Sequence, residues 1–200
     1  MEPQIPQQSL FNRKVAYEIL LKYMHNPNLL KHSLAAEAAM KGLYNHLYFG
    51  KPEYNEMDLE KWGITGLLHD ADYEMSKGRP EEHGLLLFDH EKNIPADIKH
   101  AIQSHNPATY VKPETQLDWG IRCADQLTGL VVAGALIHPD KSLAPLTPEF
   151  VLKRMNEKSF AKGADRTPIL MCEEKLGIPL FQFIDIVLKA MQGISKELGL

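Results

Sequence analysis

The chain of 200 residues has little cysteine, no excess of positive charge and no long apolar run. Cys123 and Cys172 are too few for a disulfide framework or a thiolate metal site, and they are typical of a protein from a reducing cytoplasm. The 22 Lys and Arg are outnumbered by 26 Asp and Glu, which gives a net charge of −4. Binding to a nucleic-acid polymer needs a cationic surface, so no such partner is expected.

The sequence pattern gives no sign of a membrane-spanning helix or a signal peptide. The longest apolar stretch, residues 129–137, is far shorter than the roughly 20 residues that span a bilayer. The first residues, MEPQIPQQSLFNRK, carry no apolar core of the kind that signal peptides have. We therefore expect a cytoplasmic protein without a membrane partner.

The pattern that the chain does have is helical. Apolar residues recur at three- and four-residue spacing, and no long alternation of apolar and polar residues is present. Thr115 with Asp118 forms a capping-box pattern, Thr147-Pro148 marks another helix start, and Asn28 is a suitable cap. Helices are expected over residues 9–24, 28–43, 58–68, 81–93, 95–104 and 115–137, from 147, and over 180–198. The sequence predicts an all-α fold.

No internal repeat and no linker interrupts the chain, so one compact domain over residues 1–200 is expected. The last segment carries one apolar stripe at helical spacing, made of Leu180, Ile184, Val187, Met191, Ile194 and Leu198. Such a stripe predicts a core face or an oligomer contact, and it could support a homodimer.

One acidic residue stands in an otherwise apolar helix. Asp125 lies in the segment IRCADQLTGLVVAGAL, between Cys123 and Leu127. Removing a carboxylate from water is costly, so this side chain must be paired, protonated or bound to a metal ion. Arg122, one turn back on a similar face, or another cation could form a salt bridge with it, and Arg122 could equally point to solvent.

Histidine is abundant, with nine residues in a chain that is not basic. His69 and Asp70 are adjacent and follow the apolar residues 66–68, which places polar groups beside a buried segment a second time. Imidazole nitrogens and carboxylate oxygens together are ligands for Zn, Mn, Fe or Co ions. Adjacent residues on a helix point about 100° apart, so this pair can hold one ion only from a terminal or distorted turn.

Three further histidines lie where the chain can pack closely. His32 is followed by small residues, His83 precedes a glycine, and His105 comes shortly before a proline. Any one of them could equally be a hydrogen-bonded structural residue. His100 lies about 140° from His105 on a helix, so the two are not expected to share a face. The remaining histidines are interpreted as surface or boundary residues: His25, His46, His90 and His138.

Taken in order, His32, His69-Asp70 and Asp125 resemble the signature of the HD superfamily of metal-dependent phosphohydrolases. The resemblance covers residues 28–137, and the apolar residues before His69 also match the family pattern.

Other parts of the chain extend this resemblance. His83 with Gly84, and His105, resemble the two additional histidines of members that bind two metal ions. Residues 158–161 and 172–177 resemble stand-alone bacterial and archaeal HD proteins of the HDIG type, which are predicted hydrolases.

The resemblance implies a helical HD-domain fold, with residues 28–137 as the metal-binding core and 138–200 as a C-terminal helical part. His69 and Asp70 would be the catalytic residues. One or two divalent ions per chain are implied, with Mn, Fe, Co, Zn and Ni not distinguished. The implied ligands are His32, His69, Asp70 and Asp125 for a first ion, and the bridging Asp70 with His83 and His105 for a second.

The implied activity is hydrolysis of a small phosphorylated metabolite, a nucleotide above all, by metal-activated water. Many nucleotide-cleaving HD enzymes carry Lys or Gly shortly after the His-Asp pair, whereas residues 71–74 here read ADYE. A cation for the phosphate must then come from elsewhere, and the candidates are Arg79, Lys153 and Arg154, with Lys141, Lys162 and Arg166 as others. Acidic residues are interleaved with most of these cations, so a solvated charged face also explains them. The proton donor to the leaving group stays open between Asp72, Glu74, a lysine and a histidine.

Two other functions use the same scaffold. Six-ligand HD domains also serve as di-iron oxygenases that resemble myo-inositol oxygenase, and the sequence does not separate these from hydrolases. A non-catalytic HD module that binds a nucleotide is the third possibility, and the presence of every expected ligand disfavours it.

Overall fold

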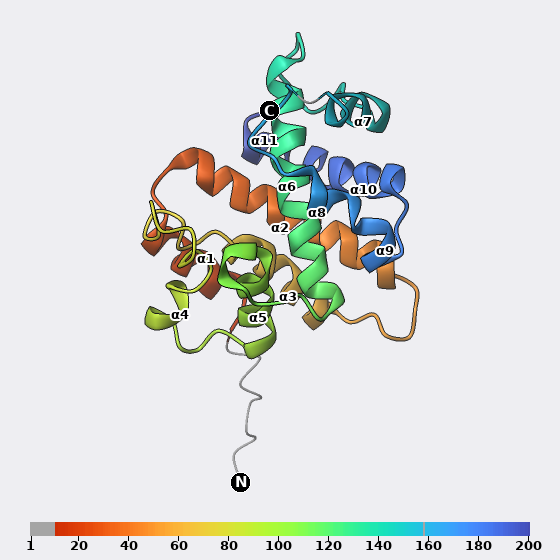
Figure 1. Cartoon of the computed structure of the whole chain (residues 1–200). Helices are drawn as coiled ribbons and strands as arrows, with labels where there is room; N and C mark the ends of the chain where they lie inside the picture. The colour runs from red at the N-terminus through yellow and green to blue at the C-terminus, as the bar shows by residue number, and fades with distance from the viewer. Residues whose placement is uncertain (1–10, 158) are drawn as a thin grey trace.

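The computed structural model describes residues 11–157 and 159–200 of the chain, and every regular element in these ranges is a helix (Figure 1). The α-helices are α1 (Arg13–Tyr23), α2 (Pro27–Tyr48), α3 (Glu56–Leu68), α4 (Leu87–His90), α5 (Ala96–His105), α6 (Gln116–Ile137), α7 (Pro148–Met155), α8 (Arg166–Leu170), α9 (Cys172–Leu176), α10 (Leu180–Gln192) and α11 (Ser195–Leu198). A short 3-10 helix covers Pro107–Thr109. The prediction of an all-α fold is confirmed.

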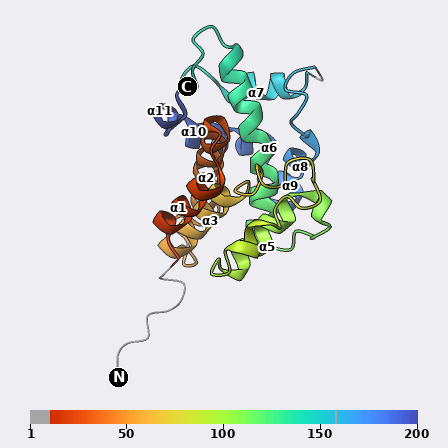
Figure 2. The same ribbon diagram turned by 90° about the vertical axis from the view of Figure 1, so that its left-hand side faces the viewer.

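The two longest helices, α2 and α6, form the centre of the molecule and pack against each other. In Figure 1, α6 runs through the middle, with α5 near its N-terminal end and α7 near its C-terminal end. Figure 2, turned by 90°, shows α1, α2 and α3 grouped on one side of α6 and α5 below the lower end of α6. The site described below lies where these helices meet.

Two apolar clusters hold the helices together. The first surrounds α2 and α6 and includes α10, whose Ile184, Val187 and Met191 are fully buried. The second joins α1, α3, α4 and α5 through residues such as Leu20 and Leu67. Of the two interpretations of the C-terminal apolar stripe, a core face or an oligomer contact, the structure therefore shows the core face.

Glycine is required where α3 crosses α2. A Cβ atom at Gly66 would lie 2.4 Å from the carbonyl oxygen of Ala36, which is closer than real atoms approach. Ala35, Ala36 and Ala39 are fully buried at the same crossing. Small side chains thus let the two backbones approach closely, and His32 lies one turn before the contact on α2.

Two helix starts agree with the sequence patterns. Both bonds of the capping box between Thr115 and Asp118 are present at the start of α6, and Thr147 caps α7. The cap predicted at Asn28 is wrong, because the Asn26 side chain accepts a hydrogen bond from the Asn28 N–H and Pro27 takes the first helical position. Proline is favoured there since its missing N–H leaves no bond unmade.

The helix predicted over residues 81–93 is also wrong. Residues 69–86 form successive turns, and only α4 is helical beyond them. Gly84 has a φ angle of +87°, which an α-helix cannot contain. The continuous helix expected over 180–198 is interrupted as well, since α10 ends at Gln192 and α11 begins at Ser195.

The buried character of α6 explains its composition. By length and apolar composition α6 could cross a membrane, yet 56% of its most apolar window is buried inside the fold, as in the core helix of a globular protein. Both cysteines lie unpaired in the same core. Burial raises the pKa of Cys123 to about 12 and that of Cys172 to about 11, so both thiols stay protonated near neutral pH.

Candidate metal centre

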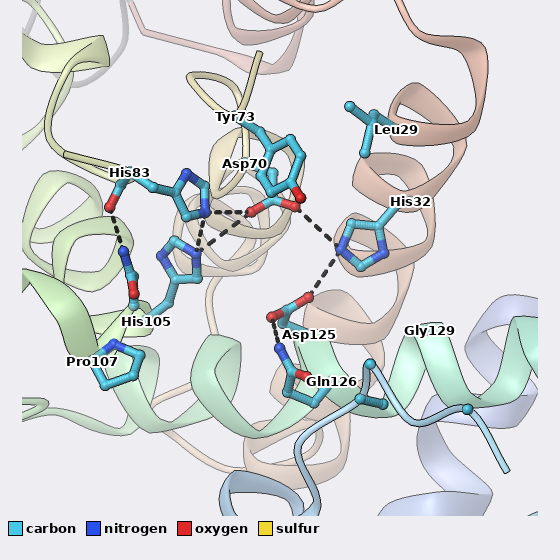
Figure 3. Close-up of a pocket in the computed structure, with 14 residues that line it drawn as sticks. Leu29, His32, Asp70, Tyr73, His83, His105, Pro107, Asp125, Gln126 and Gly129 are labelled. Atoms are coloured by element: carbon cyan, nitrogen blue, oxygen red, sulfur yellow. Dashed lines mark hydrogen bonds and ion pairs between the residues drawn. The ribbon is translucent and has the colours of Figure 1, made fainter. Parts of the chain in front are cut away.

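The structure brings six side chains from five segments together at one place, and Figure 3 draws all of them except His69. His32 comes from the second turn of α2, and Asp125 from the middle of α6. His69 is the C-cap residue of α3, and Asp70 follows it in the first turn of the loop. The remaining two are His83, in the turns of residues 69–86, and His105, the last residue of α5.

Three of these side chains form a first group, made of His32, His69 and Asp125. Their ligand atoms all lie within 4.8 Å of one another. Asp125 Oδ1 is 2.9 Å from His32 Nε2 and 3.4 Å from His69 Nε2. Two imidazole nitrogens and a carboxylate at this spacing can hold a metal ion.

Asp70, His83 and His105 form a second group of the same kind. Asp70 Oδ1 is 3.0 Å from His83 Nε2 and 3.5 Å from His105 Nε2. The other carboxylate oxygen of Asp70 lies 3.4 Å from His32 Nε2, which belongs to the first group. Asp70 therefore lies between the two groups, with His32 on one side and His83 and His105 on the other (Figure 3).

All four histidines turn the same ring nitrogen toward the centre. Each Nδ1 faces an acceptor outside the groups: the Gly66 carbonyl for His69, the Ile102 carbonyl for His105, an Asp72 oxygen for His83 and the Thr128 hydroxyl for His32. The Thr128 hydroxyl donates to the Asp125 carbonyl at 2.7 Å, so it accepts from the His32 Nδ1–H. A proton held on every Nδ1 leaves every Nε2 lone pair free for a metal ion.

Asp72 is the most heavily bonded of these acceptors. Its side chain is 1% exposed and accepts from His83 Nδ1 at 2.9 Å. The backbone N–H groups of Gly84 and Leu87 also donate to it, at 2.9 and 3.2 Å. Sequence reasoning considered Asp72 only as a proton donor and missed this role, because the bonds join residues more than ten positions apart.

One atom of the first group has no hydrogen bond. His69 is fully buried, and its Nε2 lacks a hydrogen-bond partner although two carboxylate oxygens lie 3.4 Å away. Buried polar atoms are nearly always paired, since an unpaired one costs free energy. A metal ion between His69 and these carboxylates would satisfy the lone pair, so the donor set fits a bound cation.

The carboxylates and the histidines of the site each favour the charged form of the other. Burial opposes protonation of His69, but the carboxylates of Asp70 and Asp125 outweigh it and raise its pKa to about 9. Burial also opposes protonation of His83, and Asp70 and Asp72 raise its pKa to about 10. Burial would raise the pKa values of Asp70 and Asp125, yet the neighbouring histidines hold both well below the usual range. Both carboxylates therefore stay ionised and attract cations.

A pocket of about 600 Å³ opens onto both groups. Five of the six side chains line it, while His69 lies behind them. The rest of its wall consists of Leu29, Tyr73, Asn106, Pro107, Gln126, Gly129, Ala161, Gly163 and Ala164. This volume suits a small-molecule ligand.

The cations suggested for phosphate binding do not line this pocket. Arg79 pairs with Glu82 at 2.5 Å, Arg154 pairs with Glu157 at 2.8 Å, and Lys153 is exposed on α7. Of the other candidates, Arg166 donates to carbonyl groups of residues 160–164, and Lys141 and Lys162 are exposed.

Two interpretations of neighbouring residues are settled by the contacts. Arg122 donates to the Ser104 carbonyl and stacks over Trp119, so the proposed ion pair between Arg122 and Asp125 is wrong. His100 bonds to Asp118 at 3.0 Å and lies outside the site, as expected from its angle to His105.

Comparison of the chain with protein-family models, characterised proteins and solved structures gave no match.

Proposed function

We propose that the chain is a metal-dependent phosphohydrolase of the HD type, which uses metal-activated water to cleave a small phosphorylated metabolite such as a nucleotide. One observation carries the proposal. The side chains that resemble the HD signature meet at one pocket, and every histidine among them directs Nε2 to the centre. A structural hydrogen-bond network would not require that uniform orientation.

The two groups define which residues would hold metal ions. His32, His69 and Asp125 with one oxygen of Asp70 would hold a first divalent ion, and Asp70, His83 and His105 a second. Mixed nitrogen and oxygen ligands suit Mn, Fe, Co, Zn and Ni. The ordering of each imidazole by its Nδ1 partner is the arrangement that metal-ligating histidines require.

The residues of the site then have distinct roles in hydrolysis. A divalent ion supplies a water of lowered pKa and stabilises charge on the phosphoryl oxygens. Asp70 and Asp125 stay ionised, and each imidazole, with its Nδ1 proton held by another acceptor, would give its Nε2 lone pair to the ion in place of a proton. No nucleophilic serine or cysteine is required, which agrees with two cysteines buried away from the pocket.

The structure narrows the choice of proton donor to the leaving group. Asp72 is bound to three N–H groups, and Glu74 accepts from the backbone N–H groups of His25 and Asn26. Neither lines the pocket, whereas Tyr73 does, with its ring packed edge-on against His83. We assign the donor role to the Tyr73 hydroxyl, because a neutral phenol O–H can donate to a leaving oxygen.

The test is phosphate release from a panel of nucleotides and sugar phosphates, with Mn, Co, Fe or Mg added in turn to metal-stripped protein. We expect metal-dependent release that His105→Ala lowers at least 100-fold. His100→Ala is the matched control, since it removes a histidine from the same helix outside the site. If protein that binds metal released no phosphate from any substrate of the panel, the proposal would be overturned. Iron content together with oxygen consumption would then favour the oxygenase alternative.

A further inference from the structure

The pocket is lined by no lysine or arginine from the described part of the chain, residues 11–157 and 159–200. The charged groups that line it belong to the candidate metal centre itself. Negative charge on a ligand that lies against these residues would therefore be balanced by bound metal ions.

The polar side chains of the wall are already occupied. The Asn106 amide donates to the carbonyls of Pro80 and His83 at 2.7 and 2.9 Å, and its oxygen accepts from the Ala108 N–H at 3.0 Å. The Gln126 amide donates to Asp125 at 2.7 Å and accepts from the backbone N–H of Asp165 at 2.8 Å. The wall thus offers a ligand few free hydrogen-bonding groups.

The remainder of the wall is apolar or small, and it is made of Leu29, Pro107, Gly129, Ala161, Gly163 and Ala164 with the ring of Tyr73. Such a surface favours an uncharged organic group. A charged group placed against it would lose water without gaining a partner.

The net charge of the metal-loaded centre sets how much negative charge on a ligand it can balance. Two divalent ions would bring four positive charges, and the carboxylates of Asp70 and Asp125 remove two, which leaves two. Before a bound water ionises, this remainder equals the charge of one dianionic phosphate monoester group, and ionisation of that water lowers it by one. A second phosphate group would add negative charge where the described wall has none to oppose it.

We propose that this pocket takes phosphate monoesters of uncharged alcohols and discriminates against esters with a second phosphate group. The proposal rests on the proposed function, because the charge that it counts comes from bound metal ions. It narrows the substrate class to one phosphoryl group attached to a neutral organic part.

Gly129 offers a way to change the charge of the wall alone. It lines the pocket from the middle of α6, one turn after Asp125, and a Cβ atom built there would have no atom within 4 Å. A longer side chain at this position would enter the pocket without displacing the core. Gly129→Lys therefore adds a cation to the wall, and Gly129→Met adds a neutral chain of similar length.

The experiment compares AMP with ADP on the full chain loaded with manganese. Initial rates of phosphate release give kcat/KM, and calorimetry gives the affinity for non-hydrolysable phosphonate analogues of both nucleotides. We expect AMP and its analogue to be favoured at least tenfold in each measurement. Gly129→Lys should reduce that preference at least tenfold, while Gly129→Met should leave the ratio within about twofold.

The outcomes separate the two proposals. Equal or better hydrolysis and binding of the diphosphate would overturn the charge selectivity and leave the phosphohydrolase proposal intact. Tenfold tighter binding of the monophosphate analogue without hydrolysis of either ester would support the selectivity and overturn the hydrolase. Failure of both analogues to bind would overturn the selectivity outright.

Discussion

Among the single residues of the site, Asp72 has the clearest effect on a neighbour. Its buried carboxylate holds the Nδ1 of His83 and two backbone N–H groups of the loop that carries that histidine. The orientation of His83 toward Asp70 therefore depends on a residue that touches neither the pocket nor a metal ion.

Replacing this carboxylate should weaken one metal group selectively. In Asp72→Asn one oxygen becomes an NH₂ group that faces N–H donors, so His83 loses its fixed orientation. We expect metal content after dialysis to fall from two ions per chain to one, with about 10- to 100-fold weaker binding at the second group. Asp89→Asn, an exposed acid on α4, is the control, and two tightly held ions in Asp72→Asn would contradict the assignment.

Tyr73 allows a test that depends on the leaving group. If its hydroxyl protonates the leaving oxygen, Tyr73→Phe should slow hydrolysis of an alkyl phosphate by about 10²-fold or more. p-Nitrophenyl phosphate needs little protonation, so its kcat should change less than about threefold. Equal losses on both substrates would show that Tyr73 only shapes the pocket.

At the scale of helices, the crossing of α2 and α3 fixes the distance between His32 and His69. Gly66 contacts the backbone of Ala36, and each histidine lies about one turn from that contact. A side chain at the crossing would separate the two helices and the two ligands together.

A glycine-to-alanine change at Gly66 tests the close packing of the crossing, and the same change at Gly129, away from the crossing, is the control. We expect Gly66→Ala to lower the free energy of unfolding by about 1–3 kcal/mol, as overpacking does, and to weaken metal binding. Gly129→Ala places its methyl group in open space, so it should raise stability by up to about 1 kcal/mol through helix propensity. Urea unfolding of the metal-stripped variants gives both values, and a stable Gly66→Ala would show that the crossing can relax.

Elements with local signals could be predicted from the sequence, and elements fixed by distant contacts could not. The start of α6 and the buried face of α10 follow from a capping pattern and a regular stripe. The turns of residues 69–86 could not be predicted, because Leu85, Leu86 and Leu87 imitate a helix while Asp72 bonds the backbone at distant positions.

The same distinction holds for the site. The resemblance of the histidines and acids, taken in order, to the HD signature selected the six side chains that meet. Their acceptors and the neutral wall could not be selected, since Thr128 and Ala161 carry no chemical signal in the sequence. Only the fold places them beside the ligands.

For the whole molecule, metal ions would link five segments that are otherwise joined by apolar packing. Without metal, the raised pKa values of His69 and His83 stabilise the fold when these groups are protonated. That contribution is complete below the unfolded pKa of about 6.5 and is lost as pH rises through about 9 to 10. The lowered pKa values of Asp70 and Asp125 have the opposite pH dependence. The stability that these ionised carboxylates contribute is present at neutral pH and is lost only in acid, as they become protonated.

Metal loading should reverse this dependence above neutral pH. In the presence of a chelator, we expect Tm to fall between pH 7 and 9.5 as the histidines lose protons. With a divalent ion bound, Tm should hold or rise over the same range, because ligands must be unprotonated to bind. Parallel curves with and without metal would show that these histidines do not hold it.

The two buried cysteines give the molecule an internal reporter. Cys123 precedes Asp125 by two residues on α6 and therefore points to roughly the opposite side of the helix, into the core. A thiol-reactive dye can reach this sulfur only when α6 separates from its neighbours, so the labelling rate counts openings of the core. Binding of an ion at Asp125, on one side of the helix, would then slow the labelling of the Cys123 sulfur on the opposite side.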